Sequence, residues 1–574
     1  MKPAEVIREV LKKIVGDEIN FVVEHPADES HGDFATNVCL VAFSKLGEKS
    51  SRVLAEKIVS ELRDKVELEE VIDTKRVEIA GPGFINFWLK KDWLAEELSK
   101  VTSEKDGYGT NRNLSGQKIM VEFTDPNPFK EFHIGHLMSN TIGESLARLV
   151  GASGAEVKRA NYQGDVGLHV AKSIWGWRKK MQQDGIDYED LAKKDLEEKV
   201  NYLGKSYAFG ATKYEEDESA KEEINTLNKT IYDRSNEKIN ALYDNGRKWS
   251  LDYFESIYVR LGTKFDEYFF ESEAGRVGLE VVKEGLEKGV LEESQGAIIF
   301  AGEKYGLHTR VFRNKLGLPT YEAKDLGLAK TKFERWAYDK SFIVTANEIN
   351  EYFKVVLKVM SLLYPDLASR TTHISHGLMK LKSGKMSSRT GNIITGEGLL
   401  NELHEVVLKK IGDREVDDKE NVADKVAISA LKYTVLKQAI GGDIVYDPER
   451  MTNLEGDSGP YLQYVYARCS SVINKVADEK QSNDSVAQND EEMAIMRWVY
   501  RYPEVISQAA QRFAPQLVAS YLIELAQRFN SFYNKHQILG SGDPEGFRLG
   551  ITTGVRQLIK NGLSLLGIET VEKM

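Results

Sequence analysis

Residues 119–165 read IMVEFTDPNPFKEFHIGHLMSNTIGESLARLVGASGAEVKRANYQGD, and this stretch decides the fold. It opens with an apolar, partly β-branched run at 119–123, which predicts a short buried strand of a parallel sheet. Prolines in the loop 124–132 then exclude both a helix and a hydrogen-bonded β-strand, since proline has no N–H to donate. A helix is expected from His133, with apolar residues at helical spacing, and a second strand at 157–162. The sequence therefore predicts a strand–loop–helix–strand unit, and open parallel sheets bind nucleotides at such a loop.

The loop and the start of the helix carry groups that suit a phosphate chain. His133 and His136 are one helical turn apart, and Lys130 precedes them. Three donors would thus meet beside a helix amino terminus, which itself attracts anions. Gly135 has no β-carbon, so a flat ring such as adenine could lie on its backbone. The alternative is that the two histidines are surface donors or half of a metal site, but the loop, the lysine and the strand context together favour phosphate.

Composition describes an ordinary multidomain protein. The chain has 574 residues, 41% hydrophobic and 29% charged, and no apolar run approaches the length of a membrane span. The amino terminus shows an amphipathic helical pattern without the apolar block of a secretory signal. Cys39 and Cys469 are the only cysteines, which excludes a disulfide framework and a cysteine-rich zinc site and fits a reducing cytoplasm.

The charge distribution restricts the possible partners. A net charge of −11 argues against indiscriminate nucleic-acid binding, but a shaped RNA could still meet local positive patches. One such patch spans 367–396, which contains no Asp or Glu and holds Arg370, Lys380, Lys382, Lys385 and Arg389.

The pattern of elements predicts three domains. Residues 1–110 form a separate α/β module, 111–400 a nucleotide-binding α/β domain with an insertion at about 185–305, and 401–574 an all-helical domain. In the first module His25, His31 and Asp33 suggest a metal site, but nothing else supplies ligands, so a hydrogen-bonded loop histidine is the preferred interpretation.

Two short signatures lie a whole domain apart, HIGH at 133–136 and KMSSR at 385–389. Together they resemble a class I aminoacyl-tRNA synthetase, and the detail is similar to the arginyl-tRNA synthetase family along nearly the full chain. The matching segments are HGDFATN, EFTDPNPFKEFHIGHL, NYQGDVG, FDEYFFES, the Tyr321–Asp325 element, SGPYLQYVYAR at 458–468 and VRQLIKNGLSLLGIETVEKM at the end. The resemblance implies a Rossmann-type catalytic domain with an inserted connective region. It also implies an amino-terminal module that touches the tRNA elbow and a carboxy-terminal anticodon-binding bundle.

The resemblance also implies which residues act on ATP. His133, His136, Lys385 and Arg389 would contact the phosphates with Mg²⁺ assisting, and Gly135, Met386 and Ser387 would complete the ATP site. One departure matters: the second lysine of the usual KMSKS is Ser388 here. We expect Lys130 to supply the missing charge, the alternative being that it is a solvated loop lysine.

Arginine would be recognised by carboxylates that surround its guanidinium. This group has five N–H donors in a planar fork, which match the oxygens of carboxylates. The resemblance implies an arginine site formed by Glu122, Asp125, Asn127, Tyr321, Asp325, Asn347 and Glu271. Asn347 stands where the family commonly has glutamine, so its reach is shorter. For each acid the alternative is that it serves only as an ordinary ion-pair partner. That alternative is weakest for Glu122, which lies inside an apolar strand.

For tRNA, the resemblance implies contacts from Tyr461, Gln463, Tyr464, Arg468, Phe529 and Met574, although aromatics at helical spacing are more often core residues. Phe34 and Asn37 fit the elbow-binding motif but could equally be structural. The expected partners are tRNA(Arg), L-arginine and ATP, with no membrane and no zinc, and the usual form is a cytoplasmic monomer.

Three alternative functions fit the sequence less well. A small-molecule adenylyltransferase has no use for the helical domain. A tRNA-binding paralogue without catalysis would be favoured by the loss of His133, His136 or Lys385, and all three are present. A class I synthetase for another amino acid would lack the Tyr321/Asp325 pair.

Overall fold

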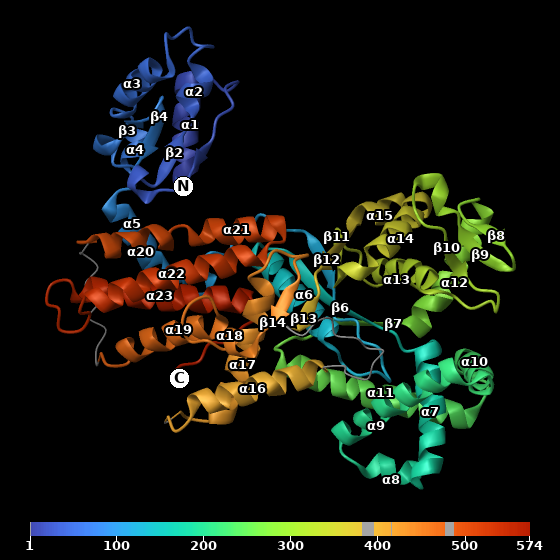
Figure 1. Cartoon of the computed structure of the whole chain (residues 1–574). Helices are drawn as coiled ribbons and strands as arrows, with labels where there is room; N and C mark the ends of the chain where they lie inside the picture. Colours follow the sequence, from blue (N-terminus) through green and yellow to red (C-terminus); the bar gives the residue numbers. More distant parts are fainter. Residues whose placement is uncertain (1, 382–394, 415, 477–486) are drawn as a thin grey trace. The chain divides into compact units, whose positions relative to one another are not determined.

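The computed structural model describes residues 2–381, 395–414, 416–476 and 487–574 (Figure 1). These residues divide into two compact units. Unit 1 contains the chain up to residue 108 together with 469–502 and 524–558, and unit 2 contains 109–468, 503–523 and 559–574.

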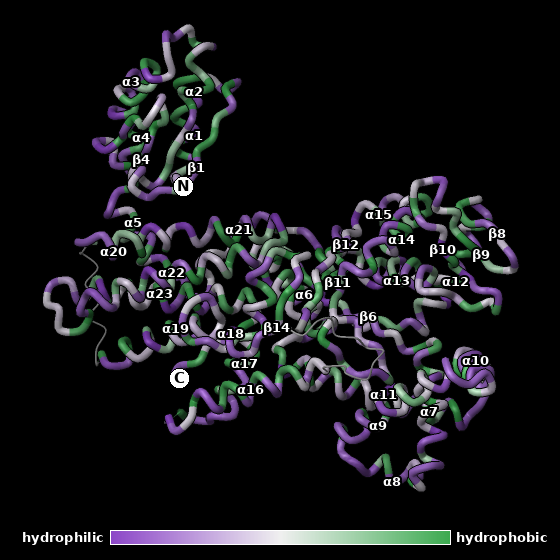
Figure 2. Tube along the Cα trace, viewed as in Figure 1, coloured by the Kyte–Doolittle hydropathy of each residue, from purple (hydrophilic) through white to green (hydrophobic). Residues whose placement is uncertain are grey.

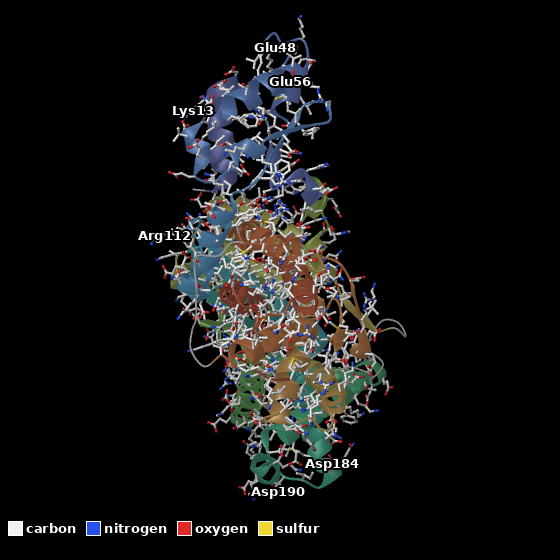
Figure 3. All side chains as sticks on the ribbon, turned by 90° about the vertical axis from the view of Figure 1, so that its left-hand side faces the viewer. Lys13, Glu48, Glu56, Arg112, Asp184 and Asp190 are labelled. Atoms are coloured by element: carbon white, nitrogen blue, oxygen red, sulfur yellow. The ribbon has the colours of Figure 1, made fainter. Side chains whose placement is uncertain are left out.

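Unit 1 begins with an α/β module built on an antiparallel sheet of order β1-β2-β4-β3. Its strands are β1 (Val23–Glu24), β2 (Phe34–Thr36), β3 (Glu78–Ala80) and β4 (Phe84–Phe87). Its helices are α1 (Pro3–Val15), α2 (Val38–Ala42), α3 (Ser51–Leu62), α4 (Val66–Glu69) and α5 (Lys91–Glu104). The apolar face of α1 is buried, whereas charged residues such as Lys13 and Glu56 lie at the outside of the module (Figure 3).

The HGDF segment of this module contacts helices that come from the far end of the chain. Asp33 is buried, and its Oδ1 lies 3.0 Å from Nε of Arg497 in α20 (Asp490–Val499). Its Oδ2 accepts the backbone N–H of Leu89 at 2.9 Å. Glu29 pairs with Arg528 of α22 (Pro515–Lys535) at 2.6 Å. Unit 1 is therefore held together by ion pairs between residues more than four hundred positions apart.

Unit 2 contains the predicted nucleotide-binding sheet. Five parallel strands take the order β12-β11-β5-β6-β7. They are β5 (Lys118–Glu122), β6 (Glu156–Gln163), β7 (Glu267–Phe270), β11 (Lys340–Ala346) and β12 (Thr371–His376). Helix α6 (Ile134–Ala152) joins β5 to β6, which confirms the strand–loop–helix–strand prediction; this mostly buried helix is largely hydrophobic (Figure 2). The chain order reverses between β5 and β11, and such switch points are where doubly wound sheets bind nucleotides.

A helical segment with its own core follows β6. It consists of α7 (Leu168–Asp184), α8 (Tyr188–Lys193), α9 (Leu196–Glu216), α10 (Glu218–Asp233) and α11 (Glu237–Arg260). Each of the last four begins at an Asp or Asn whose side chain accepts a first-turn N–H: Asp187, Asp195, Asp217 and Asn236. The outer helix α10 is mainly hydrophilic (Figure 2), as expected for a solvated face.

The insertion predicted at 185–305 is corrected in one respect. Strand β7 lies within that range but pairs with β6 in the central sheet. Its apolar side chains join the hydrophobic core of that sheet. The inserted material is thus two segments, the helices above and a small antiparallel sheet. That sheet contains β8 (Glu292–Ser294), β9 (Ala297–Phe300) and β10 (Arg310–Arg313).

Helices α12 (Glu271–Glu287) and α13 (Tyr321–Arg335) approach each other closely. A β-carbon on Gly278 would lie 2.2 Å from the carbonyl oxygen of Ala323, and one on Gly327 would lie 2.2 Å from that of Ala274. Glycine is therefore required at both positions. The close approach brings the start of α12 beside Lys324 of α13. Helices α14 (Asn350–Leu363) and α15 (Pro365–Arg370) pack on the same core.

The remainder of the chain is mainly helical, as predicted. It contains α16 (Gly396–Ile411), α17 (Lys419–Leu436), α18 (Pro448–Met451), α19 (Gly459–Ile473), α21 (Tyr502–Arg512) and α23 (Glu545–Leu565). A parallel pair of short strands, β13 (Met379–Leu381) and β14 (Ile444–Tyr446), lies among them. No helix in the described part of the chain is long and apolar enough to span a membrane.

Candidate active site

The loop after β5 holds a strained backbone at the switch point. Thr124 and Asp125 have φ values of 80° and 46°, a region that residues other than glycine seldom adopt and that is least favourable for a β-branched residue such as Thr124. Hydrogen bonds fix this conformation: the Thr124 N–H donates to Ser139 Oγ at 2.9 Å, and Asn140 Nδ2 donates to Thr124 Oγ1 at 3.0 Å. The Tyr162 N–H donates to Asp125 Oδ1 at 2.8 Å. The loop is therefore rigidly shaped by the first turns of α6 and by β6.

His133 and His136 form a reciprocal cap at the start of α6. His133 is the N-cap residue, and its Nδ1 accepts the Gly135 N–H at 3.1 Å. Nδ1 of His136 accepts the His133 N–H at 3.2 Å, and the two rings stack with centroids 3.5 Å apart. A neutral imidazole with an accepting Nδ1 carries its proton on Nε2. This cap assigns both rings the tautomer that presents an Nε2–H donor.

The electrostatics of the site favour those neutral rings. The pKa of His133 is lowered to about 4, first because the walls of the site desolvate the ring and then because Lys130 is near. The pKa of the buried His136 is lowered well below its usual value by burial, by His133 and by Lys130. Lys130 itself has a lowered pKa through desolvation, opposed by Glu271, and its Nζ lies 5.1 Å from the centre of the Tyr207 ring. The structure brings Lys130 and both histidines together, as the sequence predicted.

Asp165 connects three elements behind this loop and is 1% exposed. It accepts hydrogen bonds from the Tyr243 hydroxyl at 3.0 Å, Arg247 Nε at 2.9 Å, and both the N–H and the hydroxyl of Ser272 at 2.9 and 2.8 Å. Ser272 follows Glu271, so Asp165 fixes the beginning of α12 against β6 and α11.

Two of the predicted arginine-binding acids are buried and already paired. Glu122, 3% exposed at the end of β5, accepts from Lys332 Nζ at 2.5 Å. Glu271, 5% exposed at the start of α12, accepts from Lys324 Nζ at 2.5 Å. Both lysines lie on α13. The close packing of α12 against α13 brings Lys324 to Glu271, whereas Lys332 reaches Glu122 on β5.

The other two acids, Asp125 and Asp325, are half-buried, and no lysine or arginine pairs with them among the described residues. Asp325 Oδ2 accepts from the Tyr352 hydroxyl at 2.6 Å. The Asp325 pKa is raised to about 7. Desolvation is the main cause, Glu122 and Glu271 add to it, and the Tyr352 hydrogen bond and Lys332 oppose it. The Asp125 pKa is raised well above its ordinary range, first by desolvation and then by Glu122. The ionised forms of these two acids are therefore disfavoured, and a cation bound beside them would stabilise those forms.

The remaining predicted arginine contacts, Tyr321, Asn127 and Asn347, lie on three different segments of unit 2. Tyr321, 57% exposed, is the first residue of α13, one turn from Asp325. Asn127 lies against Gly164, where an added β-carbon would stand 2.2 Å from Asn127 Oδ1. Asn347 is half-buried in the turn after β11, on the other side of the switch point from β5. The second signature, with Lys385, Met386, Ser387, Ser388 and Arg389, falls outside the described residues.

The residues expected to meet tRNA have different environments. Gln463 is fully buried and its amide donates to the Glu569 carbonyl oxygen at 2.7 Å, while Tyr461 is 7% exposed. Phe529 is fully buried against Phe532 and Tyr533, so it offers no free face to a base in this conformation. The half-buried members are Tyr464, Arg468 and Met574.

Tyr464 and Arg468 form one accessible polar group on α19: Arg468 donates to the Tyr464 hydroxyl at 2.7 Å and lies over its ring. In the amino-terminal module Phe34 is buried beside His25, and Asn37 Oδ1 accepts the Val22 N–H at 3.0 Å. Both motif residues therefore have structural contacts within the module.

Sequence reasoning missed several residues of the site. These are His169, Asp165, Tyr352, Lys324 and Lys332. His169 is buried, its Nε2 lies 2.8 Å from the Gly164 carbonyl oxygen, and its pKa is lowered well below normal by burial and then by Lys130. The available signal was weak: two lysines eight positions apart on the otherwise apolar face of a helix.

Comparisons with known proteins cover the whole chain. Three family models match: "tRNA synthetases class I (R), catalytic domain" at residues 97–447, "DALR anticodon binding domain" at 462–574 and "Arginyl tRNA synthetase N terminal domain" at 2–89. The chain is 31% identical to an arginine–tRNA ligase of Clostridium acetobutylicum, over 99% of both proteins. It is 30% identical to one of Borrelia hermsii, over 97% of this chain and 95% of that protein.

Among solved structures, the arginyl-tRNA synthetase of Thermus thermophilus superposes with a TM-score of 0.78 at 21% identity, over 100% of this chain and 99% of that one. The Plasmodium falciparum arginyl-tRNA synthetase gives 0.78 at 20% identity, over 100% and 98%. At these low sequence identities the superpositions show a shared fold and no more.

Proposed function

This chain belongs to the class I arginyl-tRNA synthetases, and on that premise we propose how its residues divide the charging of tRNA(Arg) with L-arginine. In the first step the arginine carboxylate attacks the α-phosphorus of ATP, giving arginyl-adenylate and pyrophosphate. In the second step a ribose hydroxyl at the 3′ end of tRNA displaces AMP. Both steps need positioning and charge stabilisation rather than a covalent enzyme intermediate.

His133 and His136 stabilise the charge that develops on the phosphate oxygens. Their neutral Nε2–H donors are held by the cap at the start of α6, so little reorganisation is needed as the transition state forms. Lys130 adds the cation beside them, and we assign it the role of the signature lysine that Ser388 replaces. Lys385 and Arg389 are proposed to hold the pyrophosphate end, and Mg²⁺ arrives with the phosphates of ATP.

Asp325 is the proposed principal partner of the substrate guanidinium. It is half-buried, has no ion-pair partner among the described residues, and lies on the face of α13 that also carries Tyr321. A planar fork can bind its carboxylate with two parallel hydrogen bonds. Asp125 and Asn127 would serve the α-amino end, with Glu122, Glu271 and Asn347 around them.

On the RNA side, Tyr464 and Arg468 offer a ring face and a guanidinium to an unstacked anticodon base. The amino-terminal module is proposed to contact the tRNA elbow. A cytoplasmic location and a monomeric enzyme are part of the same proposal.

The observation that carries the proposal is that one loop joins the two sets of groups. The loop after β5 starts next to Glu122 and carries Asp125, and it ends at His133, the N-cap of α6, whose N–H is accepted by His136. A cationic amino acid and ATP would therefore meet within this site.

The test is an assay of pyrophosphate exchange and tRNA charging over a panel of amino acids that includes arginine, lysine and citrulline, with and without tRNA. Arginine alone should support both reactions. Citrulline is uncharged and cannot form the ion pair, and lysine lacks the planar fork of N–H donors. We therefore expect the enzyme to reject each of them by about 10⁴-fold relative to arginine. Charging of another amino acid would refute the proposed specificity. tRNA binding with no exchange under any condition would favour the alternative, a tRNA-binding paralogue without catalysis.

A further inference from the structure

Helix α13 carries two buried lysines, one on each side of Asp325 in the sequence. Lys324 is 3% and Lys332 is 1% exposed, and lysine is almost never buried so deeply unless it is paired. Each donates to Oε2 of one buried glutamate, Lys324 to Glu271 and Lys332 to Glu122, both at 2.5 Å.

In each pair the lysine occupies one oxygen of the carboxylate. For Glu271 the second oxygen points toward the loop that carries Asn127, because a β-carbon built on Gly164 would lie 3.0 Å from Oε1 and 2.2 Å from Asn127 Oδ1. For Glu122 the hydrogen bonds within the described residues go to Oε2, where Lys332 also lies 3.3 Å from Ser341 Oγ. The lysines thus fix the two side chains while leaving Oε1 of each for another donor.

The four acids of the pocket differ in their partners. Among the described residues, Glu122 and Glu271 are paired with lysines, whereas Asp125 and Asp325 have raised pKa values and no lysine or arginine partner. Arginine brings two cationic groups, the guanidinium and the α-ammonium. Without the lysines four carboxylates would repel one another, and some would take up protons instead of binding the substrate.

We propose that Lys324 and Lys332 are positioning residues for arginine selection, which hold Glu271 and Glu122 as one-sided acceptors for the substrate's cationic groups. This inference rests on the proposed function. Burial alone would lower the pKa of Lys332, but Glu122 and Tyr338 keep that pKa above its usual value. Lys332 therefore stays charged where it pairs with Glu122.

The test compares Lys332→Met, Glu122→Gln and the double variant in the full-length enzyme, with the KM for arginine and the KM for ATP measured separately. Lys332→Met should raise the arginine KM about ten- to a hundredfold, since a buried carboxylate loses its partner, and leave the ATP KM within about twofold. Because the lysine acts through the glutamate, the double variant should be no worse for arginine than Glu122→Gln alone. Lys332→Arg should recover part of the loss.

Lys330→Met is the matched control, since Lys330 is a half-buried lysine on the same helix, and it should behave as wild type. If Lys332→Met does not fold, the double variant Glu122→Gln with Lys332→Met, in which neither buried charge remains, can be compared with Glu122→Gln. The second pair gives an independent comparison, with Lys324→Met, Glu271→Gln and their double variant. An unchanged arginine KM, an equal rise in the ATP KM or strictly additive effects would overturn the inference. Wild-type protein that fails to charge tRNA with arginine would instead refute the proposed function.

Discussion

The Tyr352 hydroxyl donates a hydrogen bond to Asp325 Oδ2 at 2.6 Å, joining α14 to α13 at the carboxylate proposed to read the guanidinium. This contact opposes the desolvation that raises the Asp325 pKa to about 7. Because a protonated Asp325 cannot pair with a guanidinium, arginine binding is expected to depend on pH near neutrality.

We therefore expect the KM for arginine to rise as the pH falls from 8 to 6, with the KM for ATP much less affected. Tyr352→Phe removes an interaction that lowers the Asp325 pKa, so the rise should begin at a higher pH in that variant. Steady-state charging assays across this pH range provide the measurement. Identical profiles for the variant and the wild type would contradict the role of the hydroxyl.

The same pKa shift has a predictable effect on folding. The Asp325 pKa is higher in the folded chain than its ordinary value of 3.8, so the folded state binds the proton more tightly. The stability that this proton gives is present below about pH 4 and is lost as the pH rises to about 7. Asp325→Asn should consequently raise the melting temperature at pH 8 while it abolishes arginine charging. A lower melting temperature at pH 8 would show that the ionised carboxylate stabilises the fold.

His133→Asn separates the cap from the catalytic donor. Asparagine is a good N-cap residue, so α6 should remain stable, but the Nε2–H donor is lost. The expected fall in kcat is about 10²–10³-fold, with the melting temperature nearly unchanged. His133→Ala is the companion variant and should lose about 1 kcal/mol of stability in addition. Near-normal turnover in His133→Asn would remove this ring from catalysis.

Lys130→Met should be unusually damaging because Ser388 replaces the second lysine of the usual signature. The loss of a cation near the transferring phosphate is expected to cost about 10²-fold or more in kcat. Lys130 also lowers the pKa of His133 and His136, so both values should rise in the variant and the acid limb of the rate profile should move to higher pH. Stopped assays from pH 5 to 9 would detect both effects, and an unchanged rate would indicate that Arg389 suffices.

Gly164→Ala tests the packing beneath the amino-acid site. The new methyl group would stand 2.2 Å from Asn127 Oδ1 and 3.0 Å from Glu271 Oε1, so at least one of these side chains must move. We expect the arginine KM to rise about tenfold with a smaller change for ATP, since a displacement of about 1 Å in a binding group is costly. Gly107→Ala, where nothing lies within 4 Å of the added carbon, is the control and should behave as wild type.

Several parts of the fold could be predicted because the information is local. The β5–α6–β6 unit follows from an apolar run, a proline-containing loop and helical spacing, and the four aspartate and asparagine caps explain where α8, α9, α10 and α11 begin. The assignment of β7 to an insertion was wrong because strand pairing is not a local property. Its four residues look alike whether they pair with a neighbouring hairpin or with the distant β6.

By itself, the sequence determined the doubly wound catalytic fold and the two histidines at the start of α6, since these depend on residue type and short-range spacing. The acids proposed for the cationic substrate came from the family resemblance instead. Only the tertiary structure decided which acids are already neutralised. Glu122 meets Lys332 across 210 positions and Glu271 meets Lys324 across 53, whereas Asp325 meets a tyrosine. The physical reason is that the pairing of a buried charge depends on which helix packs against which strand or helix, and no local pattern records that contact. The Lys324–Glu271 pair, for example, forms where glycines let α12 and α13 approach closely.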